Sequence, residues 1–347
     1  MCTDFMIRVD GNPVVNGRSM EFGLPLKSKL FFRAPGHAYG PTPGTGEFRH
    51  SWTGQYGFVG LDVFDLPLPV DGLNTAGLST GTLWLPGSAY QKVDDPAKGL
   101  TVDRFCEWVL SSFATCAEVR QALDNRVVEV GAPVFLKELL PVHFPIHDAT
   151  GDSIVVEFID GAPRIHDNPV GVLTNDPPFP WHLQNLRNYT DLDPWDREKT
   201  EFDGFEVEQT GHGTGMMHLP GDSTPPSRFV RAAAMTTFAE PAKTHDEAVA
   251  LAFHVLNTVD IPTGTSRSRK GVVEENDRTQ WVAVKDLARG IYYTRFYDSP
   301  QAYAVDLDRV DLHALDGKQV AVPASPIAID LTKSLADNAV AAAPLDA

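Results

Sequence analysis

The sequence predicts an α+β fold in which antiparallel sheets are stacked and covered by helices. Clusters of short apolar strand segments flank two groups of helical segments, without βαβ alternation and without a glycine-rich phosphate loop after a strand. Because no Pro/Ser-rich linker divides the chain, we expect a single domain over residues 2–332. The alanine-rich segment 333–347 is expected to be a frayed tail.

The chain begins with strand-like segments. Residues 3–9 are apolar and β-branched enough for a strand, and Asn16-Gly17 is typical of a turn. Residues 34–55 are rich in glycine, proline and aromatic side chains and predict a surface loop. The apolar runs at 56–64 and 77–85 predict core strands.

The middle of the chain predicts one long helix followed by a strand hairpin. Apolar residues recur at intervals of three and four between residues 102 and 127, which favours an amphipathic helix covering one face of a sheet. Strands are predicted at 132–143 and 153–159, and residues 148–152 (Asp-Ala-Thr-Gly-Asp) supply a turn between them.

The last third of the chain predicts a polar loop, two helices and a second hairpin. Residues 188–216 are polar with little hydrophobic period, which indicates a loop. Helices are predicted at 228–237 and 245–256, where apolar residues recur with helical spacing. A strand hairpin is predicted from 281–284 and 290–297.

Charge and hydropathy exclude several classes of partner. The 347 residues include 29 basic and 46 acidic side chains, and a net charge of -17 argues against binding nucleic acid or an anionic membrane through the overall field. No run approaches the ~20 apolar residues of a membrane span, and no basic segment followed by an apolar one resembles an export signal. We therefore expect a cytoplasmic protein.

Cys2 directly follows Met1, which is removed readily when a small residue comes next. The mature chain would then carry a thiol and a free α-amine on one residue. An α-amine titrates near ~7.7–8.0 and a thiol near ~8.5, so the amine can accept the thiol proton. This is the logic of N-terminal nucleophile hydrolases; the alternative is an incidental cysteine. Cys106 and Cys116, ten residues apart in an apolar helical stretch, are interpreted as core thiols.

Two patches place polar side chains beside predicted strands. Arg18 and Glu21 follow the first strand three residues apart, as a site pair or as a surface ion pair worth ~0–1 kcal/mol. Asn175 follows a strand and precedes a proline-rich turn, where its amide is either an oxyanion donor or part of an Asx-turn.

A third patch places Arg228 at a helix start, behind Ser227 as the N-cap. The helix dipole opposes a cation there, which indicates a purpose other than helix stability. Trp84 lies in a strand and by itself would be a core residue.

A metal site is the competing interpretation for His143, His147 and Asp148. Residues four apart share a face of a regular strand, but Pro145 between the histidines makes a regular strand doubtful. No third ligand stands nearby at a familiar spacing, so solvated or hydrogen-bonded histidines are the better interpretation. We expect no metal and no cofactor.

The motifs in their order resemble the choloylglycine hydrolase family, which includes bile salt hydrolases and penicillin V acylases. The resemblance runs from residue 2 to about 330 and rests on Met1-Cys2-Thr3, Gly17-Arg18-x-x-Glu21, Gly171-Val-x-Thr-Asn175-x-Pro and Ser227-Arg228-Phe229-Val230-Arg231. It implies a four-layer αββα sandwich of the N-terminal nucleophile hydrolase type. It also implies a cysteine amidase that cleaves linear carbon–nitrogen amide bonds of acyl conjugates through an acyl-enzyme thioester.

The resemblance assigns a role to each matched residue. The cysteine thiol attacks the amide carbonyl, its α-amine shuttles protons, and the asparagine helps to bind the oxyanion. The implied catalytic residues are Cys2, Arg18, Glu21, Asn175 and Arg228, and the expected substrate-binding residues are Trp84, Phe22 and Met20.

Two departures leave the substrate open. Many family members have aspartate where this chain has Glu21, and bile salt hydrolases have asparagine where this chain has Trp84. The Leu-Trp-Leu run around Trp84 resembles penicillin V acylases and acyl-homoserine-lactone acylases. Residues 188–216 resemble the assembly loop of the bile salt hydrolases, which predicts a homotetramer.

We therefore expect a small-molecule acyl amide as substrate, with penicillin V acylase or general N-acyl amidase activity ranked above bile salt hydrolysis. An N-acyl-homoserine-lactone acylase ranks third. The alternative of another class is a catalytically degenerate family member that acts as a binding protein, which Glu21 and Trp84 motivate. Retention of Met1 would block the α-amine and favour that alternative.

Overall fold

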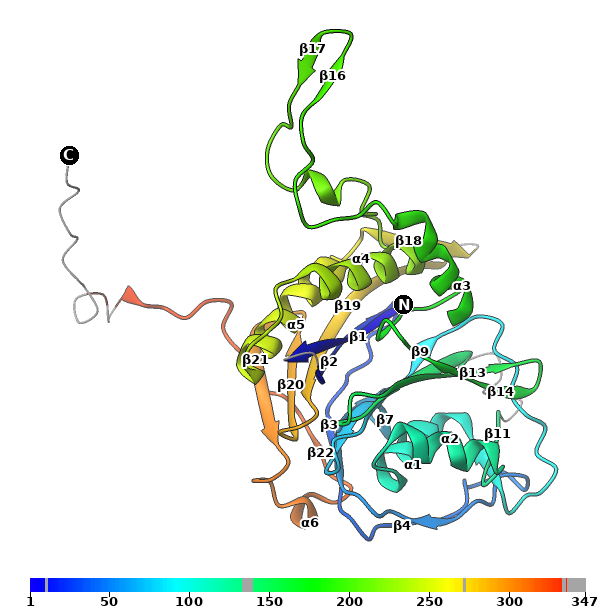
Figure 1. The fold of residues 1–347 in the computed structure, drawn as a ribbon. Helices are drawn as coiled ribbons and strands as arrows, with labels where there is room; N and C mark the ends of the chain where they lie inside the picture. The colour runs from blue at the N-terminus through cyan, green and yellow to red at the C-terminus, as the bar shows by residue number, and fades with distance from the viewer. Residues whose placement is uncertain (10–11, 133–139, 271–272, 333–334, 336–347) are drawn as a thin grey trace.

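The computed structural model describes residues 1–9, 12–132, 140–270, 273–332 and 335, and in it two β-sheets lie face to face between two pairs of helices (Figure 1). One sheet is covered by α4 (Pro225–Phe238) and α5 (His245–Val259). The other is covered by α1 (Phe105–Ser112) and α2 (Cys116–Asp124). This order of layers confirms the expected αββα sandwich.

The sheet under α4 and α5 has seven antiparallel strands, and the N-terminal strand lies in it between β15 and β2. The order is β15 (Val172–Leu173), β1 (Cys2–Val9), β2 (Asn12–Phe22), β19 (Val273–Asp286), β20 (Ile291–Phe296) and β21 (Ser299–Asp306), with β18 (Ser266–Lys270) also paired to β19.

The sheet under α1 and α2 has nine strands. Their order is β14 (Ala162–Asp167), β13 (Ser153–Ile159), β12 (Val142–His147), β8 (Ser79–Gly81), β7 (Leu66–Asn74), β6 (Phe58–Val63), β3 (Leu30–Arg33) and β22 (Gln319–Val320), with β9 (Leu83–Trp84) also paired to β12.

Short elements connect the layers. The two-stranded pairs are β4 (Ala38–Tyr39) with β5 (Trp52–Thr53), β10 (Gly99–Thr101) with β11 (Glu129–Gly131), and β16 (Thr200–Phe202) with β17 (Phe205–Val207). The short helices are η1 (Val102–Arg104), α3 (Phe179–Asn185), η2 (Leu186–Tyr189), η3 (Thr214–Met216) and α6 (Leu312–Leu315). Among the described residues, no helix combines the length and apolar character needed to cross a bilayer.

Most strands and helices lie where the sequence predicts them, but Asn16-Gly17 is not a turn. Both residues lie inside β2, where Gly17 pairs with Phe5 on β1. A Cβ atom at position 17 would lie 2.5 Å from Cζ of the Phe5 ring, so glycine permits this close cross-strand approach. The glycine therefore marks close packing between neighbouring strands of one sheet.

The predicted helix over residues 102–127 is wrong as one element. It is divided into η1, α1 and α2 because Phe113 leaves the helical conformation and Thr115 starts a new helix. The Thr115 side chain accepts a hydrogen bond from the Glu118 backbone N–H, and the Glu118 carboxylate accepts one from the Thr115 N–H. This capping box fixes the second start. Cys106 and Cys116 are buried, which confirms them as core thiols.

The doubt about a regular strand at Pro145 was also wrong, because β12 passes through it. Pro145 pairs with Val155 on β13, and its carbonyl, facing the other neighbour, accepts a hydrogen bond from the Thr80 hydroxyl at 2.8 Å. On that side, β8 pairs with β12 from Ile146 and β9 pairs with it up to His143. The missing N–H of proline therefore falls at the interruption between these two strands.

The structure also differs from the sequence prediction at the start of α4 and in residues 188–216, and some predicted segments lie outside the described residues. Helix α4 begins at Pro225 with Thr224 as its N-cap, so Ser227 lies inside the helix and does not cap it. Residues 188–216 contain the end of η2, η3 and the β16–β17 hairpin, which projects away from the body in Figure 1. Of the strand predicted at 132–143, residues 133–139 lie outside the described residues, as does the tail 333–347 except residue 335.

Candidate active site

Cys2 is the first residue of β1 and lies at the end of the strand, opposite Met20 on β2. Its side chain is buried, with Sγ 3.7 Å from the Met20 sulfur and 3.8 Å from Nη2 of Arg18. Alternation along β2 turns Arg18 and Met20 to the same face of the sheet. The first two strands therefore bring a thiol and a guanidinium into contact.

Arg18 is fully buried and its guanidinium is held on several sides. Nη1 donates to the Val70 carbonyl and forms an ion pair with Asp71 at 3.1 Å, while Nη2 donates to the Thr82 carbonyl at 2.5 Å. Burial lowers the pKa of Arg18, but the nearby carboxylate of Asp71 more than offsets this and keeps the guanidinium charged. Arg18 is thus a fixed positive charge beside the thiol.

The sequence did not reveal the buried side chains that support Arg18. Asp71 on β7 also accepts hydrogen bonds from Lys285 Nζ at 2.6 Å and from the Tyr292 hydroxyl at 2.7 Å. Lys285 Nζ donates in addition to Asn16 Oδ1 at 2.7 Å. All four side chains are buried. The available signal was a charged residue within an apolar strand segment, in 66–74 and 281–286, because buried charges need partners.

Asn175 lies just after β15, in the segment that leads to α3. Its Oδ1 accepts the Cys2 backbone N–H at 2.8 Å and a guanidinium N–H of Arg228 at 2.7 Å. Its Nδ2 donates to the Trp84 carbonyl at 2.8 Å. Because an amide nitrogen carries two hydrogens, one donor of Asn175 is left for a ligand.

Arg228 lies in the first turn of α4, as the sequence indicated, and is fully buried. Besides Asn175, its Nη1 donates to the Cys2 carbonyl at 2.5 Å and to the Thr3 hydroxyl at 2.6 Å, and its Nε donates to the Ser223 carbonyl at 3.0 Å. Burial lowers the pKa of Arg228. The arginine therefore serves to fix the N-terminal residues, at the expense of an unfavourable helix position.

Glu21 is buried near the site, but its carboxylate does not hold the Cys2 nitrogen. Its Oε1 accepts the Thr279 hydroxyl at 2.8 Å, and its Oε2 lies 4.0 Å from Nη1 of Arg228. Burial raises the pKa of Glu21, while the charge of Arg228 opposes this rise. Thr279, on β19, is a contact that the sequence did not reveal.

A cavity of about 90 Å³ opens beside the thiol, and its walls are mostly apolar. Phe22 and Trp84 meet edge to face with ring centroids 6.3 Å apart, and Phe22 meets Phe64 in the same way at 6.2 Å. Met1 lines this cavity beside Cys2, Met20 and Glu21. The structure thus brings together all eight residues expected in the site, with Phe64 as an addition.

The histidines weighed as metal ligands have other partners. His143 contacts Glu157 at 3.0 Å and His147 contacts Asp4 at 2.6 Å, and all four residues are buried. His143 and His147 therefore belong to two separate hydrogen-bonded pairs.

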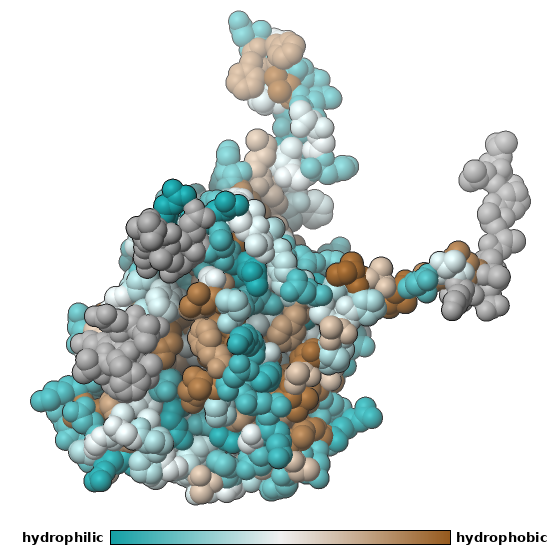
Figure 2. All heavy atoms as spheres, turned by 180° about the vertical axis from the view of Figure 1, so that it is seen from behind, coloured by the Kyte–Doolittle hydropathy of each residue, from teal (hydrophilic) through white to brown (hydrophobic). Residues whose placement is uncertain are grey.

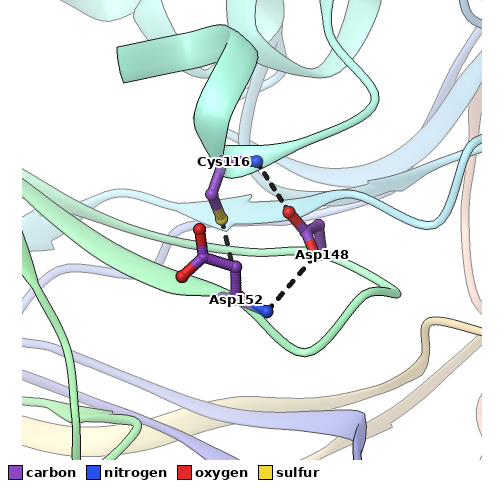
Figure 3. Close-up of side chains that lie close together, drawn as sticks. All are labelled: Cys116, Asp148 and Asp152. Atoms are coloured by element: carbon purple, nitrogen blue, oxygen red, sulfur yellow. Dashed lines mark hydrogen bonds between the residues drawn. The ribbon is translucent and has the colours of Figure 1, made fainter.

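A second group, Cys116, Asp148 and Asp152, is compact enough for an ion (Figure 3). The Asp148 carboxylate is already engaged, because it accepts the Cys116 backbone N–H at 2.7 Å and the Asp152 backbone N–H at 3.3 Å. Burial raises the pKa of the Cys116 thiol far above its usual range, which disfavours the thiolate that binds metals. This cluster ties the 148–152 turn to the start of α2.

Comparison with known proteins places this geometry in a family. The model of the linear amide C–N hydrolases, choloylglycine hydrolase family, matches residues 2–322. The bile salt hydrolase/transferase of Clostridium perfringens is 32% identical over 92% of this chain and 95% of its own length. The penicillin V acylase of Pectobacterium atrosepticum is 28% identical over 94% of this chain and 86% of its own length.

Solved structures agree with the sequence comparison. A variant of conjugated bile acid hydrolase from Clostridium perfringens superposes with a TM-score of 0.82 at 30% identity, covering 95% of this chain and all of that one. Penicillin V acylase from Agrobacterium tumefaciens gives 0.74 at 27% identity, covering 90% and 88%. The chain belongs to the choloylglycine hydrolase family and is a linear amide C–N hydrolase with an N-terminal cysteine.

Proposed function

We propose that Cys2 is the nucleophile of an amidase that becomes competent when Met1 is removed. The freed α-amine takes the thiol proton, and Sγ attacks the carbonyl carbon of the substrate amide. The amine then returns the proton to the leaving nitrogen, which leaves a thioester that water hydrolyses. The observation that carries this proposal is the convergence of Arg18, Asn175 and Arg228 on one N-terminal cysteine.

We assign a role in the reaction to each of three side chains that contact Cys2. Arg18, 3.8 Å from Sγ, stabilises negative charge on the sulfur. Asn175 orients the α-amine through Oδ1 and offers its second Nδ2 hydrogen to the oxyanion of the tetrahedral intermediate. Arg228 fixes the Cys2 carbonyl and Asn175 together. These contacts support one catalytic domain over residues 2–332, because the segments involved are far apart in sequence.

We propose that the Glu21 carboxylate interacts electrostatically with Arg228 and with the α-amine of Cys2. Its carboxylate is buried and lies 4.0 Å from Arg228. The extra methylene relative to aspartate accounts for its contact with Thr279 in place of the Cys2 nitrogen. Glu21 therefore acts at longer range than Asn175.

The substrate class that we propose is an acyl amide with a flat aromatic or chain-like acyl group, as in penicillin V. Trp84 and Phe22 support it, because their edge-to-face rings wall the cavity and Met20 forms its floor beside the thiol. Hydrolysis of conjugated bile acids is the second candidate, since the C. perfringens bile salt hydrolase is 32% identical. An acyl-homoserine lactone and a purely binding role rank below these.

Substitution of Trp84 by asparagine tests the choice of substrate. The expected result is a fall in kcat/KM for penicillin V by roughly tenfold or more and a smaller fall, or a gain, for glycocholate, because the aromatic wall is removed. Phe253, a partly buried aromatic residue of α5 that does not line the cavity, provides the control variant Phe253→Leu. An unchanged ratio of the two activities in Trp84→Asn would contradict the assignment to aromatic acyl groups.

We also propose that the protein is a homo-oligomer, with a tetramer expected, held by the projecting segment 188–216. Figure 2 shows hydrophobic surface at the tip of this projection. Trp195, Phe202 and Phe205 are 79%, 66% and 71% exposed, which is unusual for aromatic residues that have no partner surface.

A further inference from the structure

Two buried histidines contact the backbone carbonyls of the segment that carries Asn175. Nε2 of His143, on β12, lies 3.0 Å from the Thr174 carbonyl oxygen. Nε2 of His182, on α3, lies 2.9 Å from the Asn175 carbonyl oxygen. Two side chains from different layers thus reach consecutive carbonyls of one short segment, and both histidines are completely buried. None of the roles proposed above uses either histidine.

The partners of His143 determine its protonation. Its Nδ1 lies 3.0 Å from Oε1 of Glu157, and its Nε2 faces a backbone carbonyl. A carboxylate and a carbonyl only accept hydrogen bonds, so a ring with two N–H groups would satisfy both of them. Glu157 would balance the positive charge of such a ring within the same buried pair.

Glu157 links this pair to the next element. Its Oε1 also accepts the Phe179 backbone N–H at 2.9 Å, at the start of α3, and its Oε2 lies 3.6 Å from Nε2 of His166. Burial raises the pKa of Glu157, but the hydrogen bond with His143 and the nearby His166 ring outweigh it and lower the pKa to about 2. The carboxylate is therefore ionised, as a cationic His143 requires.

His182 makes its contact as a neutral ring. Burial lowers its pKa to about 4, with the positive charge of His143 acting in the same direction. The proton resides on Nε2, because the Asn175 carbonyl can only accept. The ring stacks on Phe229 with centroids 4.7 Å apart and an interplanar angle of 15°. Phe229 follows Arg228, so His182 couples the Asn175 segment to the helix that carries the arginine.

We propose that His143, as an imidazolium, and His182, as a neutral imidazole, are positioning residues that fix the backbone of residues 174–175 and so aim the Asn175 amide at Cys2. The inference rests on the proposed oxyanion role of Asn175. Neither histidine lines the cavity beside Cys2. Loss of either contact lets the amide move, which weakens oxyanion binding more than substrate binding.

Kinetics of His143→Gln and His182→Gln test the proposal. Each variant is expected to lower kcat at least about tenfold with KM changed less than about twofold, because the defect concerns the transition state. The matched control is His147→Gln, which also removes a buried histidine–carboxylate contact on β12 but touches neither Thr174 nor Asn175. It is expected to retain kcat within about twofold despite lower stability. A kcat loss in the control equal to that in the other two would overturn the proposal.

The protonation of His143 has a readout that needs no substrate. In protein labelled with nitrogen-15 histidine, the ring of one histidine should show two protonated nitrogens at pH 7 and should lose this signature in Glu157→Gln. The His182 ring should show one proton, on Nε2, at the same pH. A neutral His143 ring in the wild type would overturn the inference, whether or not His143→Gln folds. If the wild type hydrolyses none of the test amides while this signature is present, the proposed function fails and the structural inference stands.

Discussion

The Oδ1 atom of Asn175 lies 2.8 Å from the backbone nitrogen of Cys2 and accepts its hydrogen bond, although the residues are 173 positions apart. In a chain without Met1, this nitrogen is the α-amine to which we assign the role of base. The Asn175 amide oxygen thus holds this nitrogen, and the same oxygen accepts a guanidinium N–H of Arg228 at 2.7 Å. One side chain thus connects the proposed base, the proposed oxyanion donor and the buried arginine.

Substitution of Asn175 by alanine should therefore impair catalysis severely. Loss of one preorganised donor costs ~2.7–4 kcal/mol of transition-state stabilisation, which corresponds to a fall in kcat of about 10²–10³. Steady-state amine release from the hydrolysed substrate measures it. Asn188→Ala, at an exposed position in η2, is the control and should keep the wild-type rate. A kcat for Asn175→Ala within threefold of wild type would show that the amide takes no part in the chemistry.

Asp71→Asn should destabilise the fold. The Asp71 carboxylate is the shared partner of Arg18 and Lys285, and both cations are fully buried. Removing its charge leaves them uncompensated, at a cost of about 3–5 kcal/mol. Urea unfolding gives this difference in free energy. Asp65→Asn, which breaks the solvent-exposed pair with Lys29, should change the unfolding free energy very little. Equal effects in the two variants would refute a buried anion at Asp71.

The depressed pKa of Glu157 predicts a pH dependence of stability. The pKa is lowered from 4.5 to about 2 in the folded protein, so the contribution is fully present above pH 4.5 and is lost as the pH falls toward 2. The shift corresponds to about 3 kcal/mol. The advantage of wild type over Glu157→Gln in unfolding free energy should shrink between pH 5 and about 2.5. A difference that stays constant across this range would mean that Glu157 has an ordinary pKa.

The projecting segment gives a prediction about assembly. The double variant Phe202→Ser, Phe205→Ser should convert a tetramer into smaller species, because both rings are exposed at the β16–β17 turn and would lose their hydrophobic contacts. Light scattering on the eluted protein measures the mass. Val127→Ser, an exposed apolar residue elsewhere, should leave the assembly intact. A wild type that elutes as a monomer would contradict the proposed interface directly.

The sequence indicated which side chains lie close to Cys2 better than it predicted the boundaries of elements. Cys2 stands out as a thiol directly after Met1, and Arg228 stands out as a cation at a helix start, where the helix dipole opposes it. The division of the helix at Phe113–Thr115 depends on a local capping box that competes with an uninterrupted apolar period. Likewise, whether a strand can pass through Pro145 depends on how the neighbouring strands pair with β12, which the local sequence does not show.

The supporting groups could not be predicted, because they become partners only when the sheets stack. Asp71 and Lys285 are 214 residues apart, and Thr279 meets Glu21 across strands from opposite ends of the chain. From the sequence, His143 stands out only as a possible metal ligand. Its contacts with Glu157 and Thr174 arise from three separate segments that no spacing rule connects.

The most direct test of the account is amine release by the Met1-free protein and by Cys2→Ser, offered penicillin V, glycocholate and a long-chain acyl-homoserine lactone in parallel. Mass spectrometry first establishes that Met1 is absent, and circular dichroism establishes that the variant keeps the fold. The account predicts release from at least one substrate by the wild type, foremost penicillin V, and a loss of about 10³-fold or more in Cys2→Ser. Equal release by the folded Cys2→Ser variant would contradict it.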